Sequence, residues 1–473
     1  MLETISPTFQ VGKWAERRVG LQLPSVESWT RFAVGLVVRV DATRPGAQEL
    51  TCDIAGRPVR ALLYTDLMPP ASPGDKLILN TAALDANLGT GGQALAVSPL
   101  PPADDAAPLP IVDGGFLVKA RYTPLQAVVR GVDEQTSPHH ETLAEADQLD
   151  GMPVVTADLH SALPAIVAGI LADRPDLRIV YIMSDGAALP LAYSRTVAQL
   201  KAAGALAATI TAGQAFGGDF EATTVHSALL AARLVVEADI AVVIQGPGNL
   251  GTGTRWGFSG VAVGEAVNAA GVLGGQPVGA LRVSGADARA RHRGLSHHSI
   301  TAYGQVAQHP CLLPIPTPPT QLTRSRANQS QIDEIRQEQL AHGQAGQGQA
   351  TRGQAGQGQA AHAQAGQGQA THAQAGQGQA NPTNVTGGEP SQGQLWQGEA
   401  TDLAELVAGI VRDLAPIVEP KGRHRAVMVA TDGLMDALRA SPVPLSTMGR
   451  TLDQDPAAFI TSAAAGRQAA TLT

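Results

Sequence analysis

The hydrophobic positions of the chain follow different patterns before and after about residue 150. In the first part, short runs rich in Val, Leu and Ile are separated by turn signals such as Arg44-Pro45-Gly46 and Gly89-Thr90-Gly91-Gly92. Closely spaced runs of this kind predict a small antiparallel barrel or sandwich. The five expected strands cover residues 32–40, 49–54, 58–64, 76–80 and 93–97.

Beyond residue 150, short apolar runs alternate with longer segments of helical spacing. This alternation is typical of βαβ units with right-handed crossovers. We therefore predict an α/β fold, a doubly wound and mostly parallel sheet preceded by the small N-terminal antiparallel β-barrel or sandwich module. The expected strands are 153–157, 179–183, 205–211, 240–244, 278–283 and 426–429, and the expected helices are 161–171, 189–203, 220–237, 259–270, 403–414 and 455–470.

The expected domain organisation has four parts: a β-rich domain at 1–119, the α/β domain at 120–322, an insertion at 323–400, and the end of the α/β domain at 401–473. Within the insertion, residues 341–380 repeat a ten-residue unit of the type AHGQAGQGQA four times. Such a Gly, Gln and Ala repeat contains almost nothing to bury, so we predict that it is disordered.

The composition of the chain argues against several classes of protein. The 44% hydrophobic share is enough for a sizeable core, and the net charge of -8 without a basic stripe argues against nucleic-acid binding. Two widely separated cysteines disfavour a disulfide framework or a cysteine zinc site. No apolar stretch reaches ~18 residues and no basic segment precedes an apolar one at the start, so we expect no membrane span and a cytoplasmic location. A homo-oligomer is compatible with these features.

Polar residues follow each predicted strand of the parallel sheet. Ligands of such sheets bind beyond the carboxyl ends of the strands, close to the point where the strand order reverses. We therefore expect one cleft containing carboxylates, imidazoles and free backbone amides. Its catalytic candidates are Asp158, His160, Asp185, His297 and His298, and the last two belong to a polar segment, 291–299, that also contains His292.

Glycine-rich loops indicate where a small anionic or phosphorylated molecule would bind, because glycine leaves backbone N–H groups open to an anion. The turn at 246–253 has the G-x-G-x-x-G spacing, but no helix opens within it and Pro247 removes a donor. An ordinary tight loop is the alternative reading. The anion-binding candidates are Gly217, Gly218, Asp219, Gly246, Gly248, Gly251, Thr252, Gly253 and Arg255.

Two histidine doublets, His139-His140 and His297-His298, are candidate ligands of a divalent metal. No H-E-x-x-H spacing fixes a zinc geometry, so loop histidines held by hydrogen bonds, or acid–base groups, are the alternatives. Asp158 and His160, two residues apart, fit a metal or an acid–base pair, but Asp158 also fits a helix cap. For Asp219, an N-cap of the helix at 220–237 is the competing role.

Five segments together resemble an uncharacterised bacterial family, domain of unknown function 3866. They are residues 63–67 (LYTDL), 119–126 (KARYTPLQ), 137–140 (SPHH), 245–253 (QGPGNLGTG) and 294–298 (GLSHH). The resemblance covers about residues 10–320 and the part from 401, so the Gln-rich repeat is expected to lie outside the family pattern. It implies a bacterial, cytoplasmic setting and assigns no catalytic residue.

Two functions fit the sequence. The first is an α/β enzyme of hydrolase or transferase type that acts on a small anionic or phosphorylated molecule at the carboxyl edge of the sheet. The alternative is a non-catalytic protein that senses a metabolite or assists assembly, with the β module and the repeat binding a partner.

Overall fold

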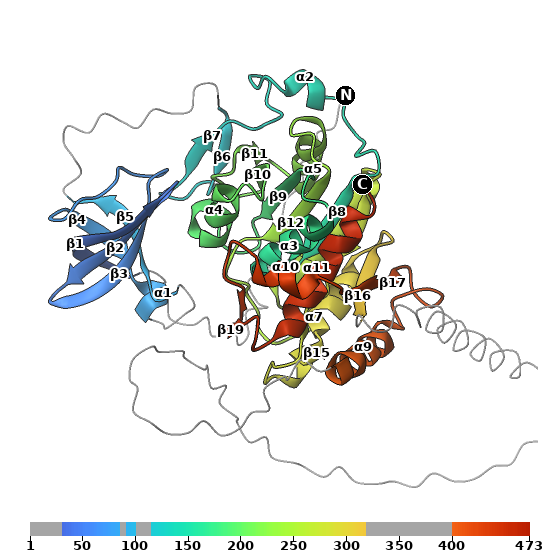
Figure 1. Cartoon of the computed structure of the whole chain (residues 1–473). Coiled ribbons are helices and arrows are strands. Elements are labelled where there is room, and N and C mark those ends of the chain that lie inside the picture. Colours follow the sequence, from blue (N-terminus) through green and yellow to red (C-terminus); the bar gives the residue numbers. More distant parts are fainter. Residues whose placement is uncertain (1–30, 86–90, 101–114, 318–399) are drawn as a thin grey trace, which may run out of the picture. The chain divides into compact units, whose positions relative to one another are not determined.

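The computed structural model describes residues 31–85, 91–100, 115–317 and 400–473 (Figure 1). The predicted insertion therefore lies outside the described residues, except for its last residue. The chain divides into two compact units, Met1–Leu109 and Pro110–Thr473. This division comes earlier than the predicted boundary at 119, because strand β6 (Leu117–Lys119) pairs with β7 (Ala127–Val129) inside the second unit.

The first unit is a closed five-stranded barrel with the strand order β1-β2-β3-β5-β4. Every neighbouring pair is antiparallel except β3 and β5. Alternate residues point into the barrel, where Leu50, Leu63 and Leu79 are almost fully buried. A barrel, one of the two predicted forms, is thus the observed one. The elements are β1 (Phe32–Arg44), β2 (Ala47–Ile54), β3 (Arg57–Tyr64), β4 (Lys76–Asn80), α1 (Ala82–Asp85) and β5 (Ala94–Pro99).

The second unit is built on an eight-stranded sheet with the order β11-β10-β9-β12-β8-β13-β16-β17. All of its neighbouring strands run parallel, which confirms the predicted α/β fold. The strand β17, beyond the insertion, pairs with β16 and so completes the same sheet. The strands are β8 (Pro153–Ala157), β9 (Ile179–Ser184), β10 (Ala208–Ala212), β11 (Phe220–Ala222), β12 (Ile240–Gln245), β13 (Gln276–Gly279), β16 (Leu312–Thr317) and β17 (Arg425–Ala430).

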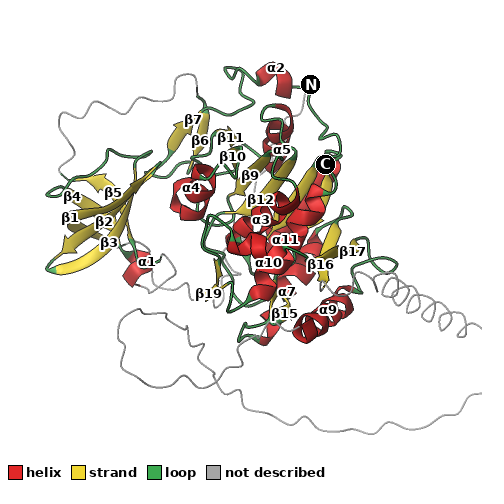
Figure 2. Ribbon diagram, viewed as in Figure 1, coloured by secondary structure: helices red, strands yellow, loops and turns green. Residues whose placement is uncertain are grey.

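Helices cover both faces of this sheet because its strands are apolar on both sides. In β12, Val242 and Ile244 pack on the side of α3 and α11, whereas Ala241 and Val243 pack on the side of α5 and α6. Figure 2 shows α3, α10 and α11 lying side by side in front of the strands. The helices are α3 (Leu163–Asp173), α4 (Arg195–Ala202), α5 (Val225–Leu234), α6 (Ala262–Val272), α7 (His297–Thr301), α9 (Ala400–Leu414), α10 (Leu434–Arg439) and α11 (Pro456–Ala470).

Short elements occupy the connections of the second unit. They are α2 (His140–Leu143) and two small antiparallel ladders, β14 (Val283–Ser284) with β15 (Gly294–Leu295) and β18 (Ser446–Thr447) with β19 (Arg450–Thr451). Among the helices of the described ranges, none is both long enough and apolar enough to cross a bilayer.

Several stretches differ from the prediction, among them the later start of α4, the division of the strand at 278–283 into β13 and β14, and the unpredicted α10. Two further differences have a clear physical reason. The expected helix at 220–237 begins only at Val225, where Thr224 and Ser227 form a capping box, and residues 220–222 are instead the edge strand β11. Strand β16 was not among the predicted strands, and it contains Pro314 and Pro316, which are unusual between two neighbouring strands. It is tolerated here because β13 pairs with β16 through a single residue pair, so most of that ladder is absent.

Candidate functional site

The strand order reverses around β8, the first strand of the large sheet. From β8 the chain builds outward through β9, β10 and β11, returns to β12, and then crosses to β13 on the other side of β8. Ligands of open α/β sheets bind at such a reversal, beyond the carboxyl ends of the strands. Asp158 follows β8 there, Gln245 ends β12, and Arg282 comes shortly after β13.

Asp158 is the centre of the contacts at this edge. Its side chain is 9% exposed, and its Oδ2 atom lies 3.4 Å from Nη1 of Arg282 and 3.3 Å from Nδ1 of His298. Burial disfavours the ionised carboxylate, but the hydrogen bond with His298 and the charge of Arg282 outweigh it, so the pKa of Asp158 lies below its ordinary value. Gln245 secures the backbone by donating from Nε2 to the Asp158 carbonyl oxygen at 2.9 Å.

The Nδ1 atom of His298 faces two groups at once. It lies 3.0 Å from Nη1 of Arg282, which only donates, and 3.3 Å from the Asp158 carboxylate, which accepts. One nitrogen cannot accept and donate in the same tautomer. A neutral His298 ring can therefore make only one of the two bonds at a time, which defines two alternative tautomeric states, one bonded from Arg282 and one bonded to Asp158. In the second, the Nε2 lone pair is free.

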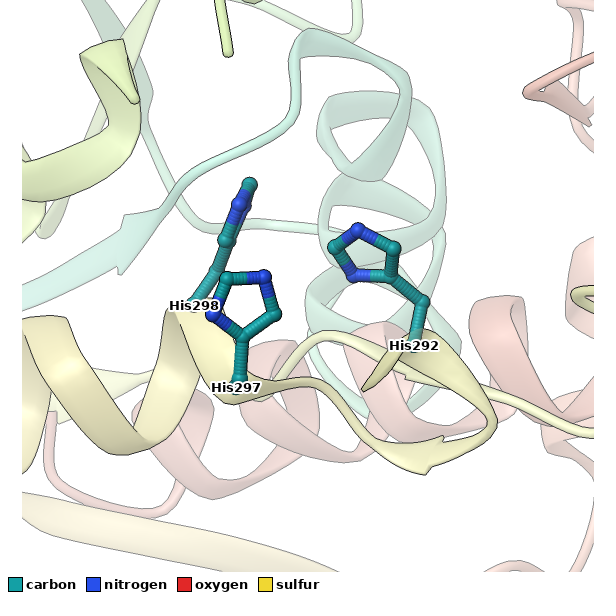
Figure 3. Close-up of side chains that lie close together, drawn as sticks. All are labelled: His292, His297 and His298. Carbon is teal, nitrogen blue, oxygen red and sulfur yellow. The ribbon is translucent and has the colours of Figure 1, made fainter. Parts of the chain in front are cut away.

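Three imidazoles lie close together here, those of His292, His297 and His298 (Figure 3). His297 and His298 open α7 behind the N-cap Ser296, and His292 closes a short 3-10 turn at Ala290–His292. The ring centroids are 4.5 to 5.0 Å apart. One ligand nitrogen from each ring lies within 4.8 Å of the others, and the described part of the chain holds no other such group of three or more His, Cys, Asp or Glu side chains.

The cluster is shielded from water. Phe258 stacks on His298 with a centroid distance of 3.7 Å and meets His297 edge-on at 6.2 Å. Burial, followed by the charge of Arg282, lowers the pKa of His292 to about 3, and burial followed by the neighbouring His298 lowers the pKa of His297. Both rings are therefore neutral at neutral pH, the form in which an imidazole can bind a metal.

A small pocket adjoins Asp158 and Arg282. Its volume is about 30 Å³ and its other polar lining includes Ser284, Asp287 and Arg450, which leaves room for about two water molecules. Hydrogen bonding to Arg289 holds the pKa of Asp287 far below its usual range. The pocket thus has fixed charges of both signs next to the imidazole cluster.

His160, a predicted catalytic residue, connects secondary structure elements. Its Nδ1 atom lies 3.2 Å from the hydroxyl of Tyr181, and its Nε2 atom lies 2.7 Å from the hydroxyl of Ser194, the N-cap of α4. Tyr181 donates onward to the Ile244 carbonyl, so it accepts from His160, and the ring is fully satisfied. Burial lowers the pKa of His160 to about 4.

The other predicted carboxylates are also bonded locally. Asp185 follows β9 and accepts from the Gln214 amide at 2.8 Å. Asp219 does not cap a helix: it accepts from the amide and hydroxyl of Thr209 and pairs with Lys201. The loop between β10 and β11 folds back along β10, so the amides of Gly217 and Gly218 donate to Glu221 and Thr211. Hydrogen bonds at the edge of the sheet therefore already use the polar groups of Asp185, Asp219, Gly217 and Gly218.

The glycine turn lies beside the cluster but is not built like a phosphate loop. After Gly246, Gly248 and Gly251 the chain returns on itself, with Thr252 donating to the Gly257 carbonyl at 2.7 Å. Residues 251–256, which include Gly253 and Arg255, are exposed. The loop ends at Phe258, so it supports the imidazoles through that ring.

The two histidine doublets do not meet. His140 bonds through Nδ1 to the Asp133 carbonyl at 2.9 Å, and His139 packs edge-on against Phe220 of the edge strand β11. Figure 1 places α2 and α7 at opposite ends of the second unit. His139 and His140 therefore lie apart from His297 and His298, and the two doublets cannot contribute ligands to one metal site.

The chain matches the model of a protein family described as "Protein of unknown function (DUF3866)" over residues 60–365 and 400–466. It belongs to this family. No curated protein and no solved structure matches it. The DUF3866 match contains the whole imidazole cluster together with Asp158 and Arg282. It also reaches into the repeat as far as 365, so only part of the repeat lies outside the family pattern.

The sequence alone does not single out His292 or Arg282 as functional. The spacing His292-x4-His297-His298 is the signal for the first, because His292 bonds through Nδ1 to the hydroxyl of Ser296, the N-cap of α7. For Arg282, the signal is a lone cation directly after the apolar run of β13. Both residues follow β13 in the sequence and lie within the range that the family model matches.

Proposed function

We propose that the protein is an enzyme of hydrolase or transferase type that acts on a small anionic molecule at the carboxyl edge of its parallel sheet. The observation that supports this most is the contact of Asp158, Arg282 and His298 at the strand reversal. A carboxylate that orients an imidazole is the usual arrangement of a general base. Arg282 supplies the positive charge that an anionic group needs.

The two states of His298 connect substrate binding with chemistry. When an anion binds Arg282, the guanidinium no longer donates to Nδ1 of His298, and this nitrogen then donates to Asp158. The Nε2 lone pair becomes available to take up a proton from a water molecule or a hydroxyl. Substrate thereby sets the tautomer that catalysis needs.

The cytoplasm is the proposed location. Cys52 and Cys311 are free, buried thiols, and burial raises the pKa of both. Thiols in this state suit a reducing compartment.

Thermal-shift titrations with inorganic phosphate and with acetate test the binding half of the proposal. Arg282→Met should weaken anion binding about 10- to 100-fold, the range of a charge-assisted hydrogen bond. Arg293→Met, which removes an exposed arginine of the same segment, is the matched control and should bind as the wild type does.

Turnover of p-nitrophenyl phosphate and p-nitrophenyl acetate tests the catalytic half. Wild-type protein should release p-nitrophenol from at least one of them, and His298→Ala should abolish the release. Anion binding that depends on Arg282, without turnover of either ester, would favour the metabolite-sensing alternative instead.

A further inference from the structure

We propose that His292, His297 and His298 form a binding site for one divalent cation of the zinc type. The inference starts from their grouping: three imidazoles from a turn and a helix start, each contributing a nitrogen within 4.8 Å of the other two. Unlike exposed acidic clusters, such a set has neutral donors and is largely buried.

The hydrogen bonds of the cluster leave the correct nitrogens available. Nδ1 of His292 lies 2.8 Å from the hydroxyl of Ser296, and Nδ1 of His298 faces Asp158. Among the described residues, no hydrogen bond uses Nε2 of either ring. Metal-binding histidines are commonly held in this way, with the second ring nitrogen bonded to a carboxylate or another polar group.

His297 provides an independent indication. Its Nε2 atom is buried and has no hydrogen-bond partner within the described ranges. A buried polar atom without a partner costs free energy, and a bound cation at this point would remove that cost. The cluster thus contains one buried polar atom, Nε2 of His297, that a cation would satisfy.

Three imidazoles select the class of metal. Nitrogen donors suit Zn²⁺, Co²⁺ and Ni²⁺, whereas Mg²⁺ and Ca²⁺ prefer oxygen ligands. Zn–N bonds of 2.0–2.1 Å place two nitrogens of a tetrahedral site about 3.3 Å apart. Binding therefore draws the rings closer by small side-chain rotations. Three protein ligands leave a fourth position open for water or substrate.

The chemical use of the metal rests on the proposed function but replaces its proton-transfer step. While a cation occupies Nε2 of His298, this nitrogen takes up no proton, and a zinc-bound water, which ionises near neutral pH, would act instead on the substrate held by Arg282. Metal binding itself is independent of turnover. It can therefore be tested separately from catalysis.

The test is calorimetric titration of chelator-treated full-length protein with Zn²⁺. Because the repeat contains His342, His362 and His372, the titration is made in a variant with these three changed to Ala. One equivalent should bind tightly, and His297→Ala should weaken binding at least about 100-fold. This is a larger loss of affinity than follows from removing a group that only hydrogen-bonds to a metal ligand. His226→Ala removes an exposed histidine of α5 and should bind as before.

Cobalt gives a readout that does not depend on any variant. Co²⁺ should produce the visible absorption of a low-symmetry tetrahedral site, Zn²⁺ should abolish it, and excess Mg²⁺ should leave it unchanged. The inference is overturned if the protein binds no zinc at one equivalent, or if folded His297→Ala and His292→Ala bind zinc as tightly as the parent. Tight zinc binding without ester turnover would support the site and contradict the proposed function.

Discussion

Oδ2 of Asp158 lies 3.3 Å from Nδ1 of His298, although 140 residues separate them in the sequence. Asp158 comes directly after β8, whereas His298 belongs to the first turn of α7. The contact joins the strand reversal of the sheet to the imidazole cluster. The orientation of His298, and whatever it binds, consequently depends on a side chain from another part of the fold.

Asp158→Asn should weaken zinc binding about 10- to 100-fold, because an amide holds Nδ1 of His298 less firmly than a carboxylate does. The same titration as for the wild type measures this. Asp185→Asn changes a carboxylate of the same sheet edge that is bonded elsewhere, and should leave the affinity unaltered. Equal affinities for both variants would show that Asp158 does not position His298.

Lys119→Met should lower the free energy of unfolding by about 3–5 kcal/mol, the cost of breaking a buried ion pair. Its ammonium is fully buried, donates to the carbonyls of Gly213, Ala215 and Ala222 at 2.8–3.0 Å, and lies 3.3 Å from Glu221. Chemical denaturation measures the loss.

The matched control for this change is Lys201→Met. Lys201 forms a half-exposed pair with Asp219, so we expect a loss of at most about 1 kcal/mol. The double variant Lys119→Met with Glu221→Gln should recover part of the loss, since it no longer leaves a carboxylate unpaired. A Lys119→Met protein as stable as the wild type would contradict the assigned role.

His160 should make the protein less stable as the pH falls from 6.5 to about 4. In this window the unfolded chain binds a proton at His160 and the folded protein does not, because burial lowers the folded-state pKa to about 4. The contribution is complete above pH 6.5 and disappears toward the folded-state pKa.

Denaturation at several pH values measures this dependence. His160→Gln keeps hydrogen-bonding groups but does not titrate, so the slope of the free energy of unfolding against pH should fall by about 1.4 kcal/mol per unit. An unchanged slope in His160→Gln would mean that the folded protein protonates this ring as easily as the unfolded chain does.

Gly169→Ala should destabilise the second unit by about 2 kcal/mol or more, the range of an overpacked core. A Cβ atom at Gly169 would lie 2.0 Å from the Ala463 carbonyl oxygen, because α3 and α11 touch backbone to backbone there. Thermal unfolding reports the change.

Gly409→Ala provides a control of the opposite sign. Its Cβ would meet only Arg412 at 3.7 Å, and alanine in a helix interior is favoured by about 0.5–1 kcal/mol. If Gly169→Ala were stabilising as well, the two helices would have to be less closely packed than observed.

Much of the fold follows from hydrophobic periodicity. The strands β8, β9 and β12 are continuous apolar runs. Because residues that follow parallel strands gather at one edge of the sheet, the sequence also predicts that Asp158 lies close to residues after β13, among them His298. The three-residue β11 has no readable pattern, and the prolines of β16 conceal a strand whose neighbour ends early.

The site was harder to predict where local structure competes with a ligand. The sequence around Asp219 fits a helix cap or an anion contact. In the structure, the loop between β10 and β11 runs back along β10, so the Asp219 carboxylate accepts a hydrogen bond from Thr209. His139 and His140 precede the first strand of the sheet, so the edge rule gives them no position. Spacing along the chain cannot reveal such placements, because they depend on which loop folds back.

The strand order also has a consequence for biosynthesis. β8 is the first strand of the sheet to leave the ribosome, yet both of its neighbours, β12 and β13, are made much later. While the intervening chain is translated, both backbone edges of β8 are unpaired and its apolar side chains are not yet covered. The growing polypeptide therefore exposes an apolar strand that can aggregate until its neighbours are made, and the imidazole cluster can form only once His298 has been synthesised.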